Sequence, residues 1–209
     1  MADSVDLRGD TYAGGTARVE ARQVDVRESL AAGEQVKVQA ERLNNAGAIE
    51  AGVRADGSTN SAGHLQLDGG SVRNGGQLVS HGSLNTDLQK LDNADGQIAA
   101  AGSATLKAKE LDNQKGQVVA QGNLTLDTDT LDNRQGSALA GQAMVVNAQA
   151  VDNRAGTLAA GGTITAKASN ALNNDGGLVE AGGHLDMQAD SLSNCLLYTS
   201  PSPRDKRQS

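Results

Sequence analysis

The chain repeats itself about every twenty residues, and this period constrains its fold more than any other feature. Successive copies open at Leu91, Leu111, Leu131 and Val151, at a constant step of twenty residues. The clearest copies read L-D-N-x-x-G-x-(I/V/L)-x-A-x-G-x-L-x-L-x-A. A repeat this short cannot bury its apolar residues alone, so its copies must pack against one another. The period therefore predicts a stacked solenoid.

Within each copy, apolar and polar residues alternate, as in the segment G-N-L-T-L-D at 122–127. A spacing of two places successive side chains on opposite faces of a β-strand. Glycines near the sixth and twelfth positions disfavour helices, and they also argue against a leucine-rich repeat, which needs a helical segment after each strand. We predict an all-β chain folded as a single right-handed parallel β-helix, with coils of about 20 residues and three short strands per coil.

The third position of the repeat is asparagine in every copy except the first, which has Val26. Stacked carboxamides can donate a hydrogen bond to the coil on one side and accept one from the coil on the other. Because buried polar groups need such partners, we interpret the column as a structural ladder rather than a ligand site. The ladder residues are Asn45, Asn74, Asn93, Asn113, Asn133, Asn153, Asn174 and Asn194.

The second position is aspartate in four consecutive copies, at Asp92, Asp112, Asp132 and Asp152. A calcium site is conceivable in such a line of carboxylates, but the glycine-aspartate nonapeptide pattern of calcium-binding β-rolls is missing. We interpret these residues as solvated turn residues and predict no metal and no cofactor.

The repeat divides the chain into three parts. Residues 1–23 are predicted to form a degenerate N-terminal coil, and residues 24–194 the regular β-helix. Between Leu43 and Val72 the step is twenty-nine residues, which fits one deletion near Gly47 and a ten-residue insertion at 53–62. That insertion is polar and rich in turn-forming residues, so we expect a surface loop.

Residues 195–209 do not continue the repeat, and they contain both prolines and the one cysteine of the chain. The stretch C-L-L-Y-T-S-P-S-P-R-D resembles the translation of a transposase-type sequencing adapter. We interpret the tail as non-native, expect it to be disordered and leave it out of fold reasoning. On this interpretation the preceding residues are an internal fragment of a longer protein.

Charge and composition argue against several classes of function. Leaving the three basic and one acidic residue of the tail out of the totals of 18 and 25 leaves 15 basic and 24 acidic residues, a net charge of about −9. This balance predicts no nucleic-acid partner. No apolar run reaches the roughly eighteen residues of a membrane span, so none is predicted. The lack of Phe and Trp indicates a narrow core of aliphatic side chains.

The repeat unit resembles the haemagglutinin repeat of filamentous haemagglutinin-like exoproteins. The likeness covers residues 24–194, and the segment 156–166 (G-T-L-A-A-G-G-T-I-T-A) is a close copy of the family's phrase. It implies a large secreted protein of the bacterial cell surface that an outer-membrane transporter exports by two-partner secretion. Some members are adhesins, and some are the toxin-delivery sticks of contact-dependent growth inhibition. By this resemblance the chain is an extended shaft, and other parts of the parent would bind a host or bacterial cell-surface receptor.

Two alternatives to a passive shaft stay open. Some β-helices degrade polysaccharides, but we expect His64, His81 and His184 to lie far apart at outward positions and find no aromatic platform for a sugar. We therefore predict no enzyme. The second alternative is direct adhesion to integrins through Arg8-Gly9-Asp10, a motif short enough to arise by chance.

Overall fold

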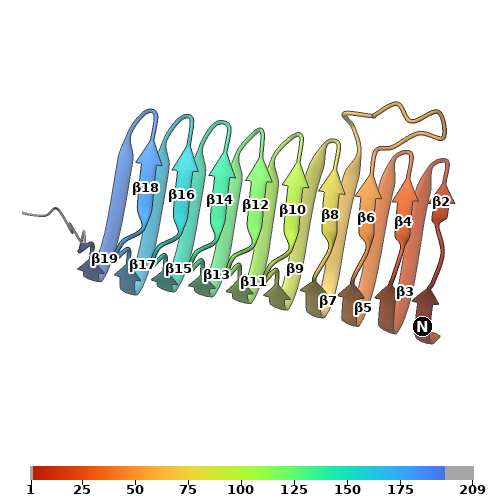
Figure 1. Ribbon diagram of the computed structural model, residues 1–209, viewed down its shortest axis with the longest axis horizontal. Coiled ribbons are helices and arrows are strands. Elements are labelled where there is room, and N and C mark those ends of the chain that lie inside the picture. Colours follow the sequence, from red (N-terminus) through yellow and green to blue (C-terminus); the bar gives the residue numbers. More distant parts are fainter. Residues whose placement is uncertain (1, 196–209) are drawn as a thin grey trace, which may run out of the picture.

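The computed structural model describes residues 2–195, which form nineteen β-strands and no helix. The strands alternate along the chain between two sheets (Figure 1), one of ten strands and one of nine, and neighbouring strands within each sheet are parallel. Each turn of the chain adds one strand to each sheet, so the turns stack into a rod. The prediction of an all-β parallel β-helix with coils of about 20 residues is confirmed.

Long strands make the ten-stranded sheet and short strands make the nine-stranded sheet. The long strands are β1 (Ala2–Leu7), β3 (Thr16–Val26), β5 (Gln35–Asn45), β7 (His64–Asn74), β9 (Ser83–Asp92), β11 (Ala104–Asp112), β13 (Leu124–Asp132), β15 (Met144–Asp152), β17 (Ile164–Asn173) and β19 (Leu185–Ser193). The short strands are β2 (Thr11–Ala13), β4 (Ser29–Ala32), β6 (Ala48–Ala51), β8 (Gln77–Ser80), β10 (Gln97–Ala100), β12 (Gln117–Ala120), β14 (Ser137–Ala140), β16 (Thr157–Ala160) and β18 (Leu178–Ala181).

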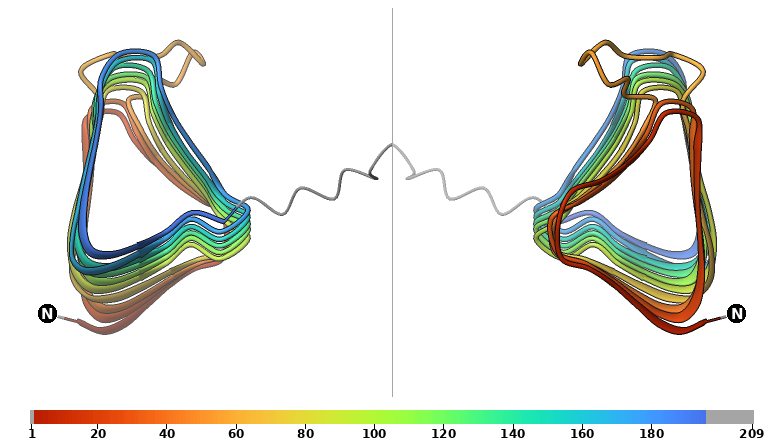
Figure 2. Two further views of the ribbon diagram at one scale, coloured as in Figure 1. Left: turned by 90° about the vertical axis from the view of Figure 1, so that its left-hand side faces the viewer. Right: turned by 90° about the vertical axis from the view of Figure 1, so that its right-hand side faces the viewer.

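Each coil contains two strands rather than the predicted three, because the long strand bends without a break. In β11 the outward residues Lys109 and Glu110 are adjacent, between the buried Ala108 and Leu111, so the in-and-out alternation shifts by one residue there. Parallel pairing to β13 continues on both sides of this point. Seen along its axis, the rod is triangular (Figure 2). One strand therefore covers two sides of the triangle.

The core is a set of aliphatic columns that run along the rod. Leu106 pairs with Leu126, which pairs with Val146, and all three are at most 1% exposed. Each such leucine gains roughly 1.5–3 kcal/mol from burial. Tyr12, the one aromatic residue among residues 2–195, is 45% exposed and stays outside this core. The narrow interior is thus filled mainly by aliphatic side chains and alanine, and its buried polar side chains are those of Ser80, Thr86, Thr128 and the asparagines of the third position from Asn45 to Asn174.

The turn after each ladder asparagine has two lengths. In the coil of Asn45 one residue separates the asparagine from Gly47, whereas from Asn93 onward two residues precede the glycine. The second of these has a positive φ, between 54° and 59° in non-glycine residues. These residues are Asp95, Lys115, Gln135 and Ala155, and Gly176 takes the same place in the next coil. Sequence reasoning did not predict this backbone conformation.

The parts outside the regular repeat extend the same rod. Strand β1 pairs with β3 and β2 pairs with β4, so residues 2–13 contribute the end strand of each sheet, and residues 16–23 already belong to β3. The insertion at 53–62 leaves the rod at the corner between β6 and β7 (Figure 2). Apart from Cys195, the tail interpreted as non-native lies outside the described residues.

Candidate functional site

The asparagines of the third position form one continuous line of hydrogen bonds. In each pair Nδ2 of one carboxamide donates to Oδ1 of the next, over 2.6–2.9 Å, from Asn45 through to Asn194. The same Nδ2 also donates to a backbone carbonyl of the following coil, as Asn113 does to Ser137 at 3.2 Å. All carboxamides therefore point the same way, with their donors toward the C-terminal end of the rod.

Glycine at the sixth position allows the backbone to approach this ladder closely. A Cβ added to Gly136 would lie inside 3.0 Å of both the carbonyl oxygen of Asn113 and Oδ1 of Asn133. The same holds for Gly116 and Gly156 in the neighbouring coils. The asparagine and glycine columns thus form one structural unit, since the ladder occupies the space that a larger side chain would need.

The ladder begins at Asn45, because Val26 occupies the equivalent place one coil earlier. Asn45 is 2% exposed, and its Oδ1 is buried without a hydrogen-bond partner among the described residues. An unsatisfied buried acceptor costs about 1–3 kcal/mol. The N-terminal end of the ladder is therefore its weakest point.

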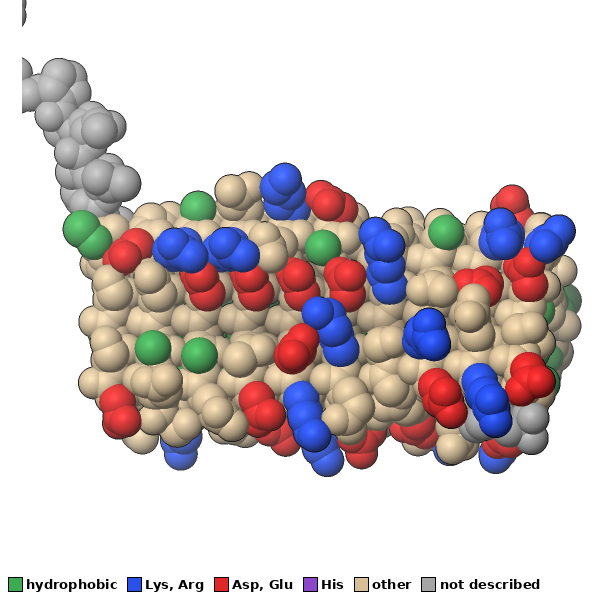
Figure 3. All heavy atoms as spheres, turned by 90° about the horizontal axis from the view of Figure 1, so that it is seen from below, with side chains coloured by type: hydrophobic (Ala, Val, Ile, Leu, Met, Phe, Trp, Pro, Cys, Tyr) green, Lys and Arg blue, Asp and Glu red, His purple; other side chains and the backbone are tan. Residues whose placement is uncertain are grey.

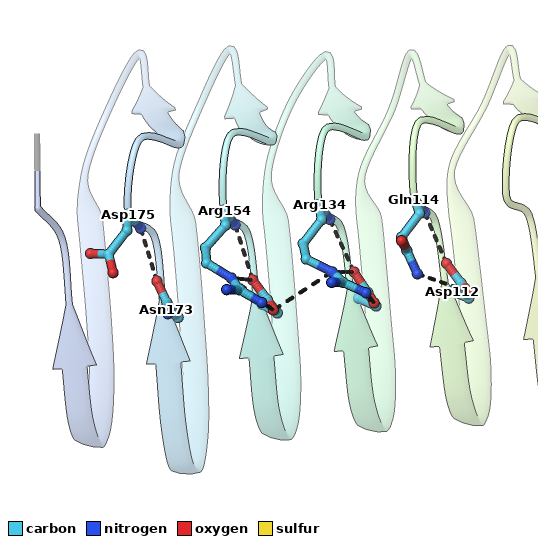
Figure 4. Close-up of polar contacts among 8 residues, drawn as sticks. Asp112, Gln114, Arg134, Arg154, Asn173 and Asp175 are labelled. Atoms are coloured by element: carbon cyan, nitrogen blue, oxygen red, sulfur yellow. Dashed lines mark hydrogen bonds and ion pairs between the residues drawn. The ribbon is translucent and has the colours of Figure 1, made fainter. Parts of the chain in front are cut away.

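The aspartates of the second position cap the turn that follows them. Oδ1 of Asp132 accepts from the backbone N–H of Arg134 at 3.2 Å, and Asp152 and Arg154 repeat this contact. The arginine side chains bind back to the same carboxylates, as Figure 4 shows, with Arg154 Nη2 at 2.7 Å from Asp152. Arg134 also lies 3.7 Å from Asp152 and so links two coils. These carboxylates are turn caps and ion-pair partners.

The electrostatics of this corner follow from the arginines. The Arg154 guanidinium holds the pKa of the Asp152 carboxyl below its ordinary value, and Asp152 in turn raises the pKa of Arg154. Rows of acidic and basic side chains run side by side along this face (Figure 3). Within residues 2–195, no three His, Cys, Asp or Glu side chains gather in a way that could hold a metal ion.

The Arg8-Gly9-Asp10 triplet lies in the turn between β1 and β2, and all three residues are exposed. Both charged side chains make contacts within the rod. Arg8 Nε donates to Asp6 at 2.7 Å, and the hydroxyl of Ser29 donates to Asp10 Oδ1 at 2.6 Å. A partner that binds the side chains of Arg8 and Asp10 would compete with these two exposed hydrogen bonds.

Comparison with known families gives a match along most of the rod. The model of the haemagglutinin repeat matches residues 12–89, 61–137 and 119–194, well over half of the chain. The chain belongs to the haemagglutinin repeat family. No curated protein and no solved structure matched in the corresponding searches. No helix among the described residues could cross a lipid bilayer.

The insertion of this haemagglutinin-repeat rod is a small hairpin. Val53 and Thr59 form an antiparallel bridge, and Gly57 turns the chain with a φ of +80°. Asn60 fixes its base, since its backbone N–H donates to Gly52 at 2.7 Å and its side chain to the carbonyl of Gly33 at 3.1 Å. The hairpin is therefore anchored to two coils of the rod.

The prediction that the three histidines lie far apart is wrong for two of them. His64 begins β7, and His81 follows β8. The two residues therefore lie at the same corner of the haemagglutinin-repeat rod, where short strands lead into long ones, in two successive coils. A 17-residue separation in sequence is nearly one coil, which returns the chain to the same corner. His64 Nδ1 lies 2.7 Å from Ser83 Oγ, and His81 Nε2 lies 2.7 Å from Glu50 Oε1. His184, in contrast, precedes β19 near the far end.

Proposed function

We propose that the chain is an extended β-helical shaft of a filamentous haemagglutinin-like surface exoprotein. The observation that supports this most is the unbroken carboxamide ladder from Asn45 to Asn194, which joins eight coils into one rod. Each coil depends only on its neighbours, so coils can be added without new long-range contacts. The rod becomes longer with every added coil, so it can extend away from the cell surface for adhesion or for presenting a receptor-binding or toxic tip.

The proposal includes location and partners. Membership of the haemagglutinin repeat family supports a secreted protein at the bacterial cell surface. An outer-membrane two-partner-secretion transporter would export the unfolded chain. The body of the repeat has no cysteine, which suits passage through a narrow pore because no disulfide can form in an oxidising periplasm. A host or bacterial cell-surface receptor would bind other parts of the parent protein.

We propose no enzymatic activity for this segment. The rings of His64 and His81 are already hydrogen-bonded to Ser83 and Glu50, in two separate pairs. Polysaccharide cleavage would instead need carboxyl groups that converge on one sugar bond. Release of reducing ends from a uronic-acid polymer by the purified chain would contradict this part of the proposal.

Deletion of one whole coil tests the shaft. Removing residues 111–130 joins Glu110 to Leu131 and keeps every column in register. We expect a folded rod about 4.8 Å shorter, measured by small-angle scattering, with any binding to cells unchanged. The matched control removes residues 111–120, which breaks the register and should prevent folding. Cell binding that disappears with the intact 20-residue deletion would contradict a passive role.

The alternative of direct adhesion through Arg8-Gly9-Asp10 is favoured by the exposure of this turn. If it holds, integrin-bearing cells bind the purified rod, and Asp10→Glu abolishes the binding. Ser29→Ala, which removes the hydroxyl that contacts Asp10, should then leave binding equal or stronger. Binding that is equal for the Asp10→Glu variant and the unmodified chain would exclude this alternative.

A further inference from the structure

Asn74 is the one asparagine of the chain that a glycine follows. An asparagine in such a pair can lose its amide without an enzyme, because the backbone nitrogen of the next residue attacks the side chain and glycine has no Cβ to hinder the approach. Asn74 is also the second member of the carboxamide ladder. The most reactive type of asparagine therefore occupies a place where the fold uses a neutral amide.

The reaction passes through a cyclic imide and needs only water. The backbone nitrogen of Gly75 attacks Cγ of Asn74, so that a bond forms between these atoms while the Cγ–Nδ2 bond breaks. Nδ2 leaves as ammonia and takes the proton of the Gly75 N–H with it. Water then opens the imide at either of its carbonyls and gives aspartate or isoaspartate. Both products carry a negative charge in place of the amide.

The folded rod holds both reacting groups in place. Asn74 is 1% exposed, and its Nδ2 donates to Oδ1 of Asn93 at 2.7 Å and to the carbonyl of Gln97 at 3.0 Å. Its Oδ1 accepts from Asn45 at 2.8 Å. The N–H of Gly75 donates to the carbonyl of Asn45 at 2.9 Å. The attack requires the Gly75 nitrogen to leave this hydrogen bond and Cγ to turn toward it, which the ladder opposes.

We propose that Asn74 is a site of spontaneous deamidation that is open in the unfolded chain and closed in the folded rod. The site closes only when the coils on both sides of Asn74 have paired with its own coil. A chain that stays unfolded therefore loses the amide, whereas a chain that folds promptly keeps it. This inference goes beyond the proposed shaft function and does not depend on how the chain is exported.

Deamidation would weaken the ladder at this position. A carboxylate at residue 74 can still accept from Asn45, but it has no N–H for Asn93 or Gln97 and would set a buried charge against their oxygens. Isoaspartate also lengthens the backbone by a carbon, which shifts the next strand relative to its parallel neighbours. The converted chain should therefore form a less stable rod.

The turn does not require glycine at position 75. The φ of Gly75 lies outside the left-handed region, and an added Cβ would have one heavy atom beyond its chain neighbours within 4 Å, the carbonyl oxygen of Asn45 at 3.8 Å. Ala46 occupies the equivalent place one coil earlier and donates to the carbonyl of Val26 in the same way. At Gly76, in contrast, an added Cβ would lie 2.0 Å from a backbone oxygen. Gly75→Ala thus removes the reactive pair and keeps the turn.

Incubation of the full chain at mildly alkaline pH, folded in buffer or unfolded in guanidinium chloride, tests the proposal. Pepsin digestion in acid halts the reaction, and mass spectrometry then locates the gain in mass from amide to acid. We expect Asn74 to react before any other asparagine in the unfolded chain, and at least about a hundredfold more slowly in the folded rod, which is rarely open. Equal rates in the two states, or faster conversion of another asparagine, would overturn the proposal.

Matched variants separate the ladder from a general effect of charge. In denaturant, where folding plays no part, Gly75→Ala should slow the conversion of Asn74 about tenfold or more. After the same incubation this variant should refold to its original stability, whereas the unmodified chain should unfold at lower urea concentration. Asn74→Asp, which carries one of the products, should do the same. Asn85→Asp adds the same charge at an exposed position of β9 and should leave the urea midpoint nearly unchanged. Equal midpoints for the two aspartate variants would contradict the expected weakening of the ladder.

Discussion

Val26 and Asn45 are paired in register between β3 and β5, and the carboxamide ladder begins at this pair. Asn45 donates to Asn74 at 2.8 Å, but its own Oδ1 faces a coil that offers no donor in its place. Each following carboxamide accepts from one neighbour and donates to the other. The ladder therefore has a direction and a defective first member, and its residues should differ in their contribution to stability.

Substitution in the middle of the ladder should cost more than substitution at its start. Asn113→Leu leaves Oδ1 of Asn133 without a donor and removes the acceptor of Asn93. Asn45→Leu also leaves one acceptor, Oδ1 of Asn74, without a donor. It removes, however, Oδ1 of Asn45, which has no hydrogen-bond partner in the described part of the unmodified chain. We expect Asn113→Leu to lower the free energy of unfolding by about 1–3 kcal/mol more than Asn45→Leu in urea denaturation. Equal losses would show that the hydrogen bonds along the ladder contribute little.

An asparagine at the place of Val26 should extend the ladder by one step. Its Nδ2 would donate to Asn45 Oδ1, and this hydrogen bond offsets the lost burial of the valine, while the unsatisfied acceptor moves to the new carboxamide, which faces Leu7. We expect Val26→Asn to stay within about 1 kcal/mol of the unmodified chain in free energy of unfolding. Val24→Asn is the control, because Val24 is fully buried in the core, and it should cost roughly 2–4 kcal/mol. A loss as large for Val26→Asn as for the control would contradict the prediction.

Because the backbone of the glycine column lies so close to the asparagine ladder, adding one methyl group to a glycine there should lower stability strongly. In Gly136→Ala the added Cβ meets the Asn113 carbonyl and the Asn133 side chain, so the turn has to move. We expect a loss of about 3 kcal/mol or more and a melting temperature lower by roughly 6 °C or more. At Gly14 an added Cβ has nothing within 4 Å, so Gly14→Ala should change stability by less than about 0.5 kcal/mol.

The positive-φ residues of the long turns should respond to glycine in the opposite sense. Ala155 has a φ of 54°, a conformation that costs an L-residue about 1–2 kcal/mol. Ala155→Gly removes this strain at some entropic cost, so we expect a gain of about 0.5–1 kcal/mol in thermal or urea unfolding. Gly176 has the same conformation, with a φ of 66°, and Gly176→Ala should lose a similar amount. A loss of stability in Ala155→Gly would show that the turn carries no such strain.

Acid should weaken the corner formed by Asp152 and Arg154. The folded-state pKa of Asp152 lies below the ordinary value of 3.8, so its stabilising effect is complete above that value and disappears as the pH falls through the folded pKa. Asp152→Asn keeps the turn cap, as Asn173 does at 2.9 Å from the backbone of Asp175, but loses the ion pair. The variant should be less stable by under about 1 kcal/mol at pH 7, and the two proteins should become equally stable once the pH has fallen below the folded pKa of Asp152. Thermal melts across this pH range would show whether the two curves converge.

The parallel β-helix and the residues that form each column could be predicted from the sequence. In a solenoid, residues one period apart become neighbours, so Leu111 pairs with Leu131 as their spacing indicates. The asparagines of the third position lie in one line for the same reason. The insertion could be located because Leu43 and Val72 are still paired despite their longer separation.

Other features depend on geometry that residue types do not encode. The bend of the long strand arises where Lys109 and Glu110 both face outward, which leaves the strand continuous where we expected a break. The positive φ at Asp95, Lys115, Gln135 and Ala155 occurs in four different residue types, so no residue preference marks it. His64 and His81 come together because His64 pairs in register with Ser83, which follows His81 by two residues at the same corner of the next coil.

The hairpin at 53–62 gives the rod an irregularity that pulling at its two ends would reveal. Under force, a stack of coils should peel from one end, one coil at a time. A regular coil of twenty residues releases roughly 70 Å of extended chain. The coil that carries the hairpin releases roughly 100 Å, because its twenty-nine residues all unravel together. A stretched rod would therefore extend in even steps with one long step, and the place of that step in the series would tell from which end the rod comes apart.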